Sequence, residues 1–208
     1  MLTYLLLAIS MRPRTISDED ILKVVRSCVL NEGPSVSTQA IAKEVGVSQA
    51  TLFKRFGNKL HLLTQALLLP VRAPKMLQTL EAQVDLDNPK EQLLNMALGM
   101  HAFFEQMVPC WSALRAAGIQ PPEADSEDAP PVRARLAIER WIATLQNQGI
   151  IYAQENPETI SIALIGALQT RSFRRHIIRD VFMKESDEDY VKDLVEFTWR
   201  ALTTKEGQ

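Results

Sequence analysis

The chain has 208 residues, which suffices for one domain, or for a small domain joined to a larger one, with a core that needs no metal or disulfide. Its 46% hydrophobic and 23% charged residues are typical of a globular protein and exclude a disordered chain, a collagen-like repeat and a membrane bundle. The formal net charge of -2 gives no sign of nucleic-acid binding, because proteins that neutralise phosphates usually carry excess Lys and Arg.

The charge is unevenly distributed along the chain. Residues 11–60 hold eight Lys and Arg against five Asp and Glu, an excess of three positive charges. The rest of the chain holds 15 basic and 20 acidic residues, an excess of five negative charges. A basic N-terminal region on an acidic body is an asymmetry that orients a protein on a polyanion.

Residues 1–10, MLTYLLLAIS, are apolar but do not have the pattern of a signal peptide or a membrane span. They lack a positively charged start and a small-residue cleavage site. They are also far fewer than the roughly 20 residues that cross a bilayer. We expect translation to begin at Met11, which makes residues 1–10 an upstream extension, and we expect a cytoplasmic protein with no membrane partner.

From residue 17 onward the sequence predicts one helix after another and no strand, and therefore an all-α fold. The first helix follows the cap Ser17 and ends near Gly33. Residues 38–45 predict a short helix that Gly46 ends, and Ser48 caps another that runs to residue 56. Two helices so close in sequence must cross steeply, which predicts a helix-turn-helix.

The second helix of this pair has an unusual outward face. With Leu52 and Phe56 directed into the core, the opposite side carries no acidic residue. A merely solvated face, which is the alternative, would be filled with Glu and Lys. The amide, hydroxyl, apolar and cationic groups found here suit base edges, thymine methyl groups and phosphates. The outward residues are Gln49, Ala50, Thr51, Phe53, Lys54 and Arg55.

Residues 40–59, AIAKEVGVSQATLFKRFGNK, with Leu62-Leu63 after them, resemble the DNA-binding domain of TetR-family transcriptional regulators. The match covers about residues 15–65 and does not extend by motif into the rest of the chain. The resemblance implies that one group of residues touches phosphates: Thr38, Ser48, Phe53 and Lys59. It implies that a second group approaches bases: Gln49, Ala50, Thr51, Lys54 and Arg55.

Phe53 and Arg55 depart from the usual family residues, and Lys59 has a position that favours phosphate. The family usually has Tyr where this chain has Phe53, so the hydroxyl that would bind a phosphate is missing, and Arg55 replaces a frequent His. Lys59 follows Asn58, a residue able to cap the next helix. A helix N-terminus favours a bound phosphate, which supports a phosphate contact for Lys59, although a solvated surface lysine is the alternative.

The body of the chain predicts a connector helix punctuated by Pro70 and Pro74, then a long helix that starts at Asn88-Pro89 and that Pro109 breaks. His101 could be the polar anchor of an otherwise apolar ligand pocket. The alternatives are a core histidine that binds a backbone carbonyl, and tryptophans that serve only packing. The candidate pocket residues are Met100, His101, Phe104, Met107, Trp111 and Trp141.

Beyond an acidic loop at residues 120–131, the sequence predicts helices at residues 132–148, 159–169 and 187–202. Residues 159–169 are apolar on nearly every side, so they must be buried all round, within the chain or between two chains. Small residues there allow close helix approach, and a four-helix interface between two copies fits both the physics and the resemblance. The candidate interface residues are Ala163, Gly166, Ala167, Val191, Leu194, Val195 and Thr198.

An enzyme is not expected, because the three histidines are widely spaced and no catalytic, metal-ligating or phosphate-binding motif is present. We expect no cofactor and no metal. The sequence predicts a DNA-binding helix-turn-helix domain at residues 11–60 and a helical ligand-binding and dimerisation domain at residues 61–208. We expect a homodimeric repressor that leaves a two-fold-symmetric DNA operator when it binds a small, mainly apolar effector. The alternative is a helical protein-interaction module that does not read DNA.

Overall fold

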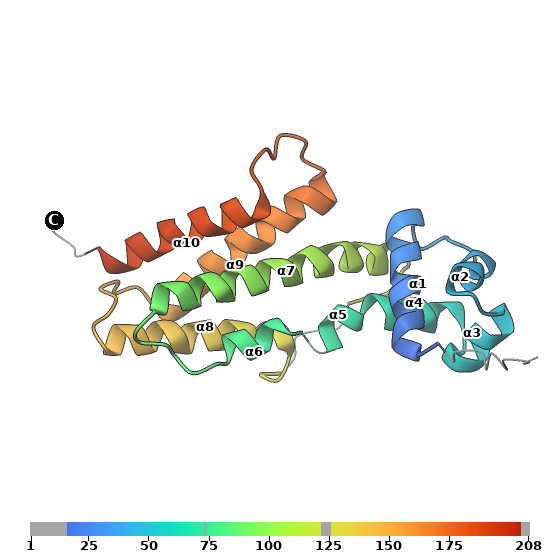
Figure 1. Cartoon of the computed structure of the whole chain (residues 1–208), viewed down its shortest axis with the longest axis horizontal. Helices are drawn as coiled ribbons and strands as arrows, with labels where there is room; N and C mark the ends of the chain where they lie inside the picture. The colour runs from blue at the N-terminus through green and yellow to red at the C-terminus, as the bar shows by residue number, and fades with distance from the viewer. Residues whose placement is uncertain (1–15, 73, 122–125, 205–208) are drawn as a thin grey trace, which may run out of the picture.

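The structure is a computed structural model that describes residues 16–72, 74–121 and 126–204. Over these residues every regular element is a helix, so the predicted all-α fold is confirmed. The molecule is elongated, with a group of short helices at one end and longer helices along the rest (Figure 1). The expected start at Met11 and the extension at residues 1–10 lie outside the described residues.

Four short helices form the N-terminal group: α1 (Asp18–Glu32), α2 (Thr38–Val45), α3 (Gln49–Phe56) and α4 (Lys59–Leu67). Each begins after a polar residue whose side chain accepts a hydrogen bond from a backbone amide of the first turn. These caps are Ser17, Ser37, Ser48 and Asn58. Local sequence therefore determines where all four helices begin.

A hydrophobic cluster holds the N-terminal group together. Its members include Ile21 and Val25 of α1, Ile41 of α2 and Leu52 of α3, all of them inaccessible to solvent. Cys110, which lies far along the chain, joins the same cluster. The N-terminal group is therefore packed against a helix of the body.

The connector between the two parts is broken into short pieces. After α4, the chain forms α5 (Leu69–Arg72) and α6 (Met76–Leu80). Pro70 lies inside α5 and Pro74 precedes α6, as expected for residues that interrupt regular helix hydrogen bonding. The predicted punctuation of the connector by prolines is thus confirmed.

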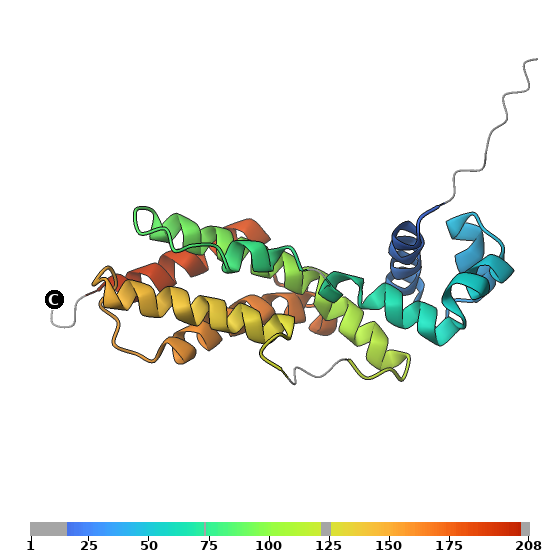
Figure 2. The same ribbon diagram turned by 90° about the horizontal axis from the view of Figure 1, so that it is seen from below.

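The longest helix, α7 (Pro89–Ala116), corrects one prediction: Pro109 lies inside it and does not break it. A proline removes one backbone hydrogen bond and costs roughly 3 kcal/mol in a helix interior. Here packing on both sides outweighs that cost, because Val108 is buried in the body core and Cys110 in the N-terminal cluster. The helix runs from the far end of the body to the N-terminal group in both views (Figures 1 and 2).

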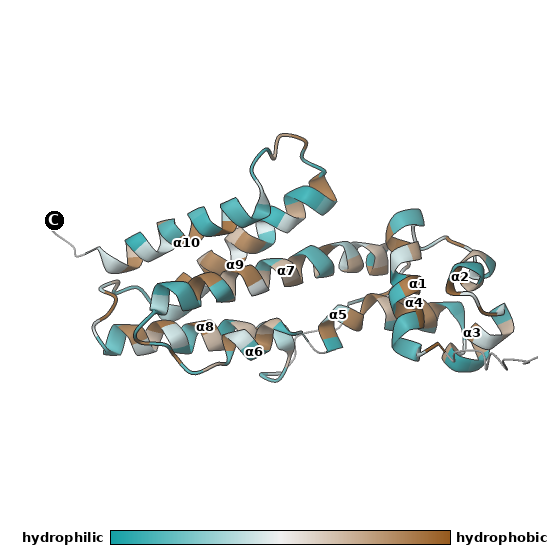
Figure 3. Cartoon of the chain, viewed as in Figure 1, coloured by the Kyte–Doolittle hydropathy of each residue, from teal (hydrophilic) through white to brown (hydrophobic). Residues whose placement is uncertain are grey.

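The body is completed by α8 (Pro130–Asn147), α9 (Pro157–Phe173) and α10 (Asp187–Thr203). Helix α9 itself runs past the predicted end at residue 169, and a π-helical turn, η1 (Arg174–Ile178), continues it. A second hydrophobic cluster joins these helices to α6 and α7. Figure 3 shows more hydrophobic colour on α9 than on α10. No helix among the described residues combines the length and the apolar character that a membrane crossing needs.

Candidate nucleic-acid interface

The turn between α2 and α3 has the geometry of a helix-turn-helix. Gly46 ends α2 in the left-handed conformation, with φ of 80° and ψ of 27°, which glycine adopts without steric cost. The amides of Gly46 and Val47 each donate to the carbonyl of Ala42, at 3.0 Å. Ser48 then caps α3, so only three residues separate the two helices, as the sequence predicts.

Helix α3 has a buried side and an exposed side. Leu52 is 0% exposed and Phe56 is also buried in the N-terminal cluster. Gln49, Ala50 and Lys54 are exposed on the other side. The helix carries no acidic residue, so its exposed side offers amide, methyl and cationic groups to solvent. This confirms the predicted inward residues and leaves the outward ones available to a partner.

Four of the residues predicted to contact DNA differ in how accessible their side chains are. The Ser48 hydroxyl accepts from the Thr51 amide at 3.1 Å and lies 2.8 Å from the Thr51 hydroxyl. Both groups remain at the accessible start of α3. Thr38 is buried, which leaves little of its side chain for a phosphate. Phe53 lies at the border of exposure, with 36% of its surface accessible.

Arg55 is engaged within the N-terminal group, and its contact with a base stays a prediction. Its Nε donates to the Asp18 carboxylate at 2.6 Å, and one of its terminal nitrogens donates to the Ile16 carbonyl at 2.8 Å. The guanidinium therefore ties α3 to the start of α1. Sequence reasoning missed this contact because the partner lies 37 residues away in sequence, where helix periodicity carries no information.

Lys54 and Lys59 have no ion-pair partner within the described part of the chain. Asn58 accepts a hydrogen bond from the His61 amide at 2.8 Å, which confirms the predicted cap and places Lys59 at the first position of α4. Lys59 therefore lies at a helix N-terminus, which favours a bound phosphate, whereas Lys54 lies in the last turn of α3. Their charges are available for such a contact, unlike that of Arg55.

The residues predicted to line a ligand pocket are mostly packed in the body core. Met100, Phe104, Met107 and Trp141 are buried there. Trp141 donates its indole N–H to Gln92 Oε1 at 2.7 Å, so it has both a packing and a hydrogen-bonding role. The structure thus brings most of the predicted residues together in one core.

His101 and Trp111 differ from their neighbours because they keep buried polar atoms without partners. Trp111 packs against both hydrophobic clusters, and its indole N–H is buried with no hydrogen bond among the described residues. Neither ring nitrogen of His101 has a hydrogen-bond partner there. The interpretation of His101 as a core histidine bound to a backbone carbonyl is therefore wrong.

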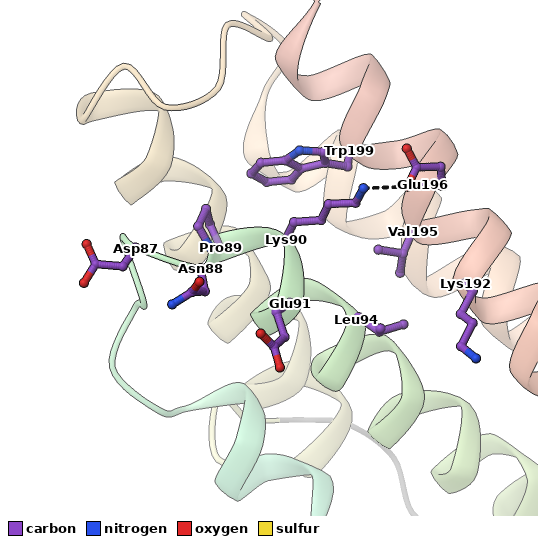
Figure 4. A pocket seen from close by; sticks show the side chains of 10 residues that line it. All are labelled: Asp87, Asn88, Pro89, Lys90, Glu91, Leu94, Lys192, Val195, Glu196 and Trp199. Carbon is purple, nitrogen blue, oxygen red and sulfur yellow. Dashed lines mark ion pairs between the residues drawn. The ribbon is translucent and has the colours of Figure 1, made fainter.

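A hollow of about 560 Å³ (Figure 4) lies at the end of the body that is remote from the N-terminal group in Figure 1. It is formed by the start of α7 and by α10, with apolar side chains of Leu94, Val195 and Trp199. Lys90 and Glu196 form a 2.6 Å ion pair across it, and the hydrogen bond from Lys90 lowers the pKa of Glu196. None of the predicted pocket residues lines this hollow.

The predicted interface residues divide into two groups. Ala163 is exposed, and Gly166, Ala167, Leu194 and Thr198 are half-buried. Val191 and Val195, however, are 0% and 2% exposed within the chain's own core, so they cannot contact a partner. Helix periodicity groups residues on one face but does not say which helix that face meets, and here α10 packs them inward.

Sequence reasoning missed several exposed apolar residues of the same region. Ile162 and Phe173 of α9 are about half exposed, and Phe197 of α10 is 69% exposed. The loop between the two helices adds Val181 and Phe182, which are largely exposed. The all-round apolar pattern of residues 159–169 was the available signal, since it requires a covering surface on every side.

Comparison with known proteins agrees with this arrangement. Residues 21–66 match the family described as bacterial regulatory proteins, tetR family. These residues run from α1 to α4 and include the helix-turn-helix. No curated protein matches the chain.

Solved structures share the fold. A TetR family transcriptional regulator, PfmR from Thermus thermophilus, is 19% identical with a TM-score of 0.65, over 88% of this chain and 99% of its own. A TetR-like transcriptional regulator from Rhodococcus sp. RHA1 is 22% identical with a TM-score of 0.60, over 93% and 99%. NalD of Pseudomonas aeruginosa is 20% identical with a TM-score of 0.59, over 89% and 96%. Residues 21–66 thus form the N-terminal domain of the tetR family of bacterial regulatory proteins, and the chain as a whole shares the fold of solved TetR-family regulators.

Proposed function

We propose that the protein is a homodimeric, sequence-specific transcriptional repressor that a small, mainly apolar ligand releases from its operator. The family's N-terminal domain and fold support a DNA-binding regulator. In this proposal residues 11–60 read DNA, and residues 61–208 form the dimer and bind the ligand. NalD, a structure with the same fold, is the secondary repressor of a multidrug efflux pump.

The observation that carries the DNA-binding proposal is the exposed, acid-free side of α3. Gln49, Ala50, Thr51 and Lys54 would approach base edges in the major groove. Ser48, Phe53 and Lys59 would lie against the phosphates, which set position and do not specify sequence. Arg55 instead holds α3 against α1, and the buried Thr38 makes at most a minor contact.

A dimer is supported by the exposed apolar residues of α9 and α10. Ile162, Phe173 and Phe197 would be covered by the same helices of a second copy, together with Ala163 and Gly166, which permit close approach. A two-fold interface is self-complementary, so one surface serves both chains. Two α3 helices would then meet half-sites separated by about 34–36 Å, or a multiple of it.

Ligand release would act through α7. This helix begins in the body core and ends in the N-terminal cluster, where Cys110 and Leu114 are buried (Figure 1). A ligand that changes the packing of the body would therefore move the N-terminal group relative to its partner copy. A coupling of about 1–3 kcal/mol changes operator affinity roughly 5- to 150-fold.

The salt dependence of DNA binding tests whether the protein is a reader or only an interaction module. We expect affinity to fall steeply as salt rises, because phosphate contacts release counterions. Lys54→Ala should weaken binding, and Lys59→Ala should in addition reduce the slope by about one. Lys23→Ala is the matched control, because Lys23 already pairs with Glu19 at 2.7 Å on α1. Weak binding that salt does not change would favour the interaction module.

The ligand-release proposal has its own test. Purified protein bound to its selected DNA should dissociate when the effector is added, and a screen of apolar compounds should find at least one that lowers DNA affinity. A compound that binds should also raise the melting temperature of the free protein. If no compound in a broad screen does either, the ligand-release proposal fails while DNA binding stands.

A further inference from the structure

Three residues able to bind a metal ion meet inside the body. His101 and Glu105 lie one turn apart on α7, and Asp187 is the first residue of α10. Each offers one ligand atom, and these atoms all lie within 4.8 Å of one another. Atoms that bind one ion at about 2.0–2.2 Å lie roughly 3–4 Å apart, so a small movement of these side chains would bring them to bonding distance.

His101 is the unusual member of this group. It is 6% exposed, and neither of its ring nitrogens has a hydrogen-bond partner among the described residues. Its Nε2 lies 3.4 Å from Asp187 Oδ2. Buried polar side chains nearly always have well-formed hydrogen bonds, whereas this imidazole has only the long contact with Asp187. A buried imidazole held beside two carboxylates is a donor set that suits a metal ion.

Neighbouring side chains orient the two carboxylates. The Ser172 hydroxyl donates to Glu105 Oε1 at 2.5 Å, and His176 Nε2 lies 3.0 Å from Glu105 Oε2. The buried Arg171 donates its Nε to Asp187 Oδ1 at 3.1 Å. Such outer partners hold ligands in place in metal sites.

Arg175 is the group that an ion would have to displace. It is paired with Asp187, and its Nη1 lies 3.6 Å from Glu105 Oε2. Together with Arg171 it balances the two carboxylate charges. Its side chain is 39% exposed, however, so it can turn to solvent and leave a net negative site.

We propose that His101, Glu105 and Asp187 bind one divalent transition-metal ion. An imidazole with two carboxylates suits ions such as Zn²⁺, Ni²⁺ and Co²⁺ better than Ca²⁺ or Mg²⁺, which prefer oxygen ligands alone. Water completes the coordination. The ion joins the middle of α7 to the start of α10. This site does not depend on the proposed DNA-binding function.

The test is a titration of the full-length protein with Co²⁺ after treatment with a chelator, followed by visible absorption. We expect d–d bands that saturate at one equivalent per chain and that Zn²⁺ removes. His101→Ala should lower Co²⁺ affinity by more than the roughly 10- to 100-fold typical of losing an outer partner. His61→Ala, which removes an exposed histidine of α4, is the matched control and should change nothing.

Arg175→Gln separates metal binding from a purely structural salt-bridge network. It removes the competing cation, so we expect Co²⁺ affinity to rise at least several-fold. A variant that merely damaged the fold would bind less, and a thermal melt of each variant monitors this. No saturable binding by the unaltered protein, equal effects of His101→Ala and His61→Ala, or weaker binding by Arg175→Gln would each overturn the proposal.

Discussion

The N-terminal helices and the body use polar groups in opposite ways. In α1 to α4, polar side chains cap helix starts or lie exposed on α3, where a partner can reach them. In the body, the Trp111 indole N–H is buried without a hydrogen bond among the described residues, and the buried His101 has only a 3.4 Å contact between its Nε2 and Asp187 Oδ2. The N-terminal helices therefore present their polar groups to solvent, whereas the body buries polar atoms that have weak hydrogen bonds or none among the described residues.

The largest expected effect breaks the dimer. Phe197 is 69% exposed in the single chain, so Phe197→Asp would place a charge in the proposed apolar interface. We expect a monomer at concentrations where the unaltered protein is a dimer, measured by sedimentation or light scattering. Leu60→Asp is the matched control, because Leu60 is an exposed apolar residue of α4 outside that interface. An unchanged mass for Phe197→Asp would contradict the interface.

A large effect on stability is expected inside the N-terminal group. Leu52 is fully buried at the crossing of α2 and α3, so Leu52→Ala should lower the free energy of unfolding by about 2–5 kcal/mol. Denaturant unfolding of the full-length protein measures this. Ala50→Ser, at an exposed position of the same helix, should change it by less than about 0.5 kcal/mol. Equal losses would mean that α3 does not have the described buried side.

A smaller effect distinguishes two neighbouring cations of α3. Arg55→Ala removes the contacts with Asp18 and Ile16, and we expect it to lower the free energy of unfolding by about 1 kcal/mol, since the pair is partly exposed. Lys54→Ala should leave stability unchanged and weaken DNA binding. Unfolding and DNA-binding measurements on both variants check this. If Arg55→Ala leaves the free energy of unfolding unchanged and Lys54→Ala lowers it, the stabilising role assigned to Arg55 and the DNA-binding role assigned to Lys54 would be contradicted.

The smallest effect concerns a thiol. Burial raises the pKa of Cys110 to about 11, with nearby Arg26 opposing the shift. At pH 8 only about one thiol in a thousand would then be ionised, and the thiolate is the reactive form. We expect Cys110 to resist a thiol reagent in the folded protein and to react at once in denaturant. Fast labelling of Cys110 in the folded protein would show that this end of α7 opens readily.

Local features made the N-terminal helices predictable. Ser17, Ser48 and Asn58 cap helices because their side-chain oxygens accept a hydrogen bond from an amide of the first turn. Gly46 ends α2 because glycine adopts the left-handed conformation without steric cost. The exposed side of α3 follows from helix geometry once Leu52 is known to be buried. The helix starts and the exposed side of α3 could therefore be predicted from the sequence, whereas the burial of Thr38 and the contact of Arg55 with Asp18 could not.

The errors involve contacts between distant residues. Pro109 was expected to end a helix, but packing of Val108 and Cys110 in two separate clusters keeps α7 continuous. Arg55 meets Asp18 far away in sequence. The cluster of His101, Glu105 and Asp187 forms only when α10 folds against α7. None of these contacts can be predicted from the residues that neighbour each partner in the sequence.

The selection of bound sites from random DNA by the purified full-length protein tests the central claim most directly. We expect a two-fold-symmetric consensus with half-sites one helical turn, or a multiple of it, apart. Because the face of α3 would read bases, Gln49→Ala should change the consensus or relax it at one position in each half-site. Recovery of random sequences, or of a consensus without two-fold symmetry, would contradict the account.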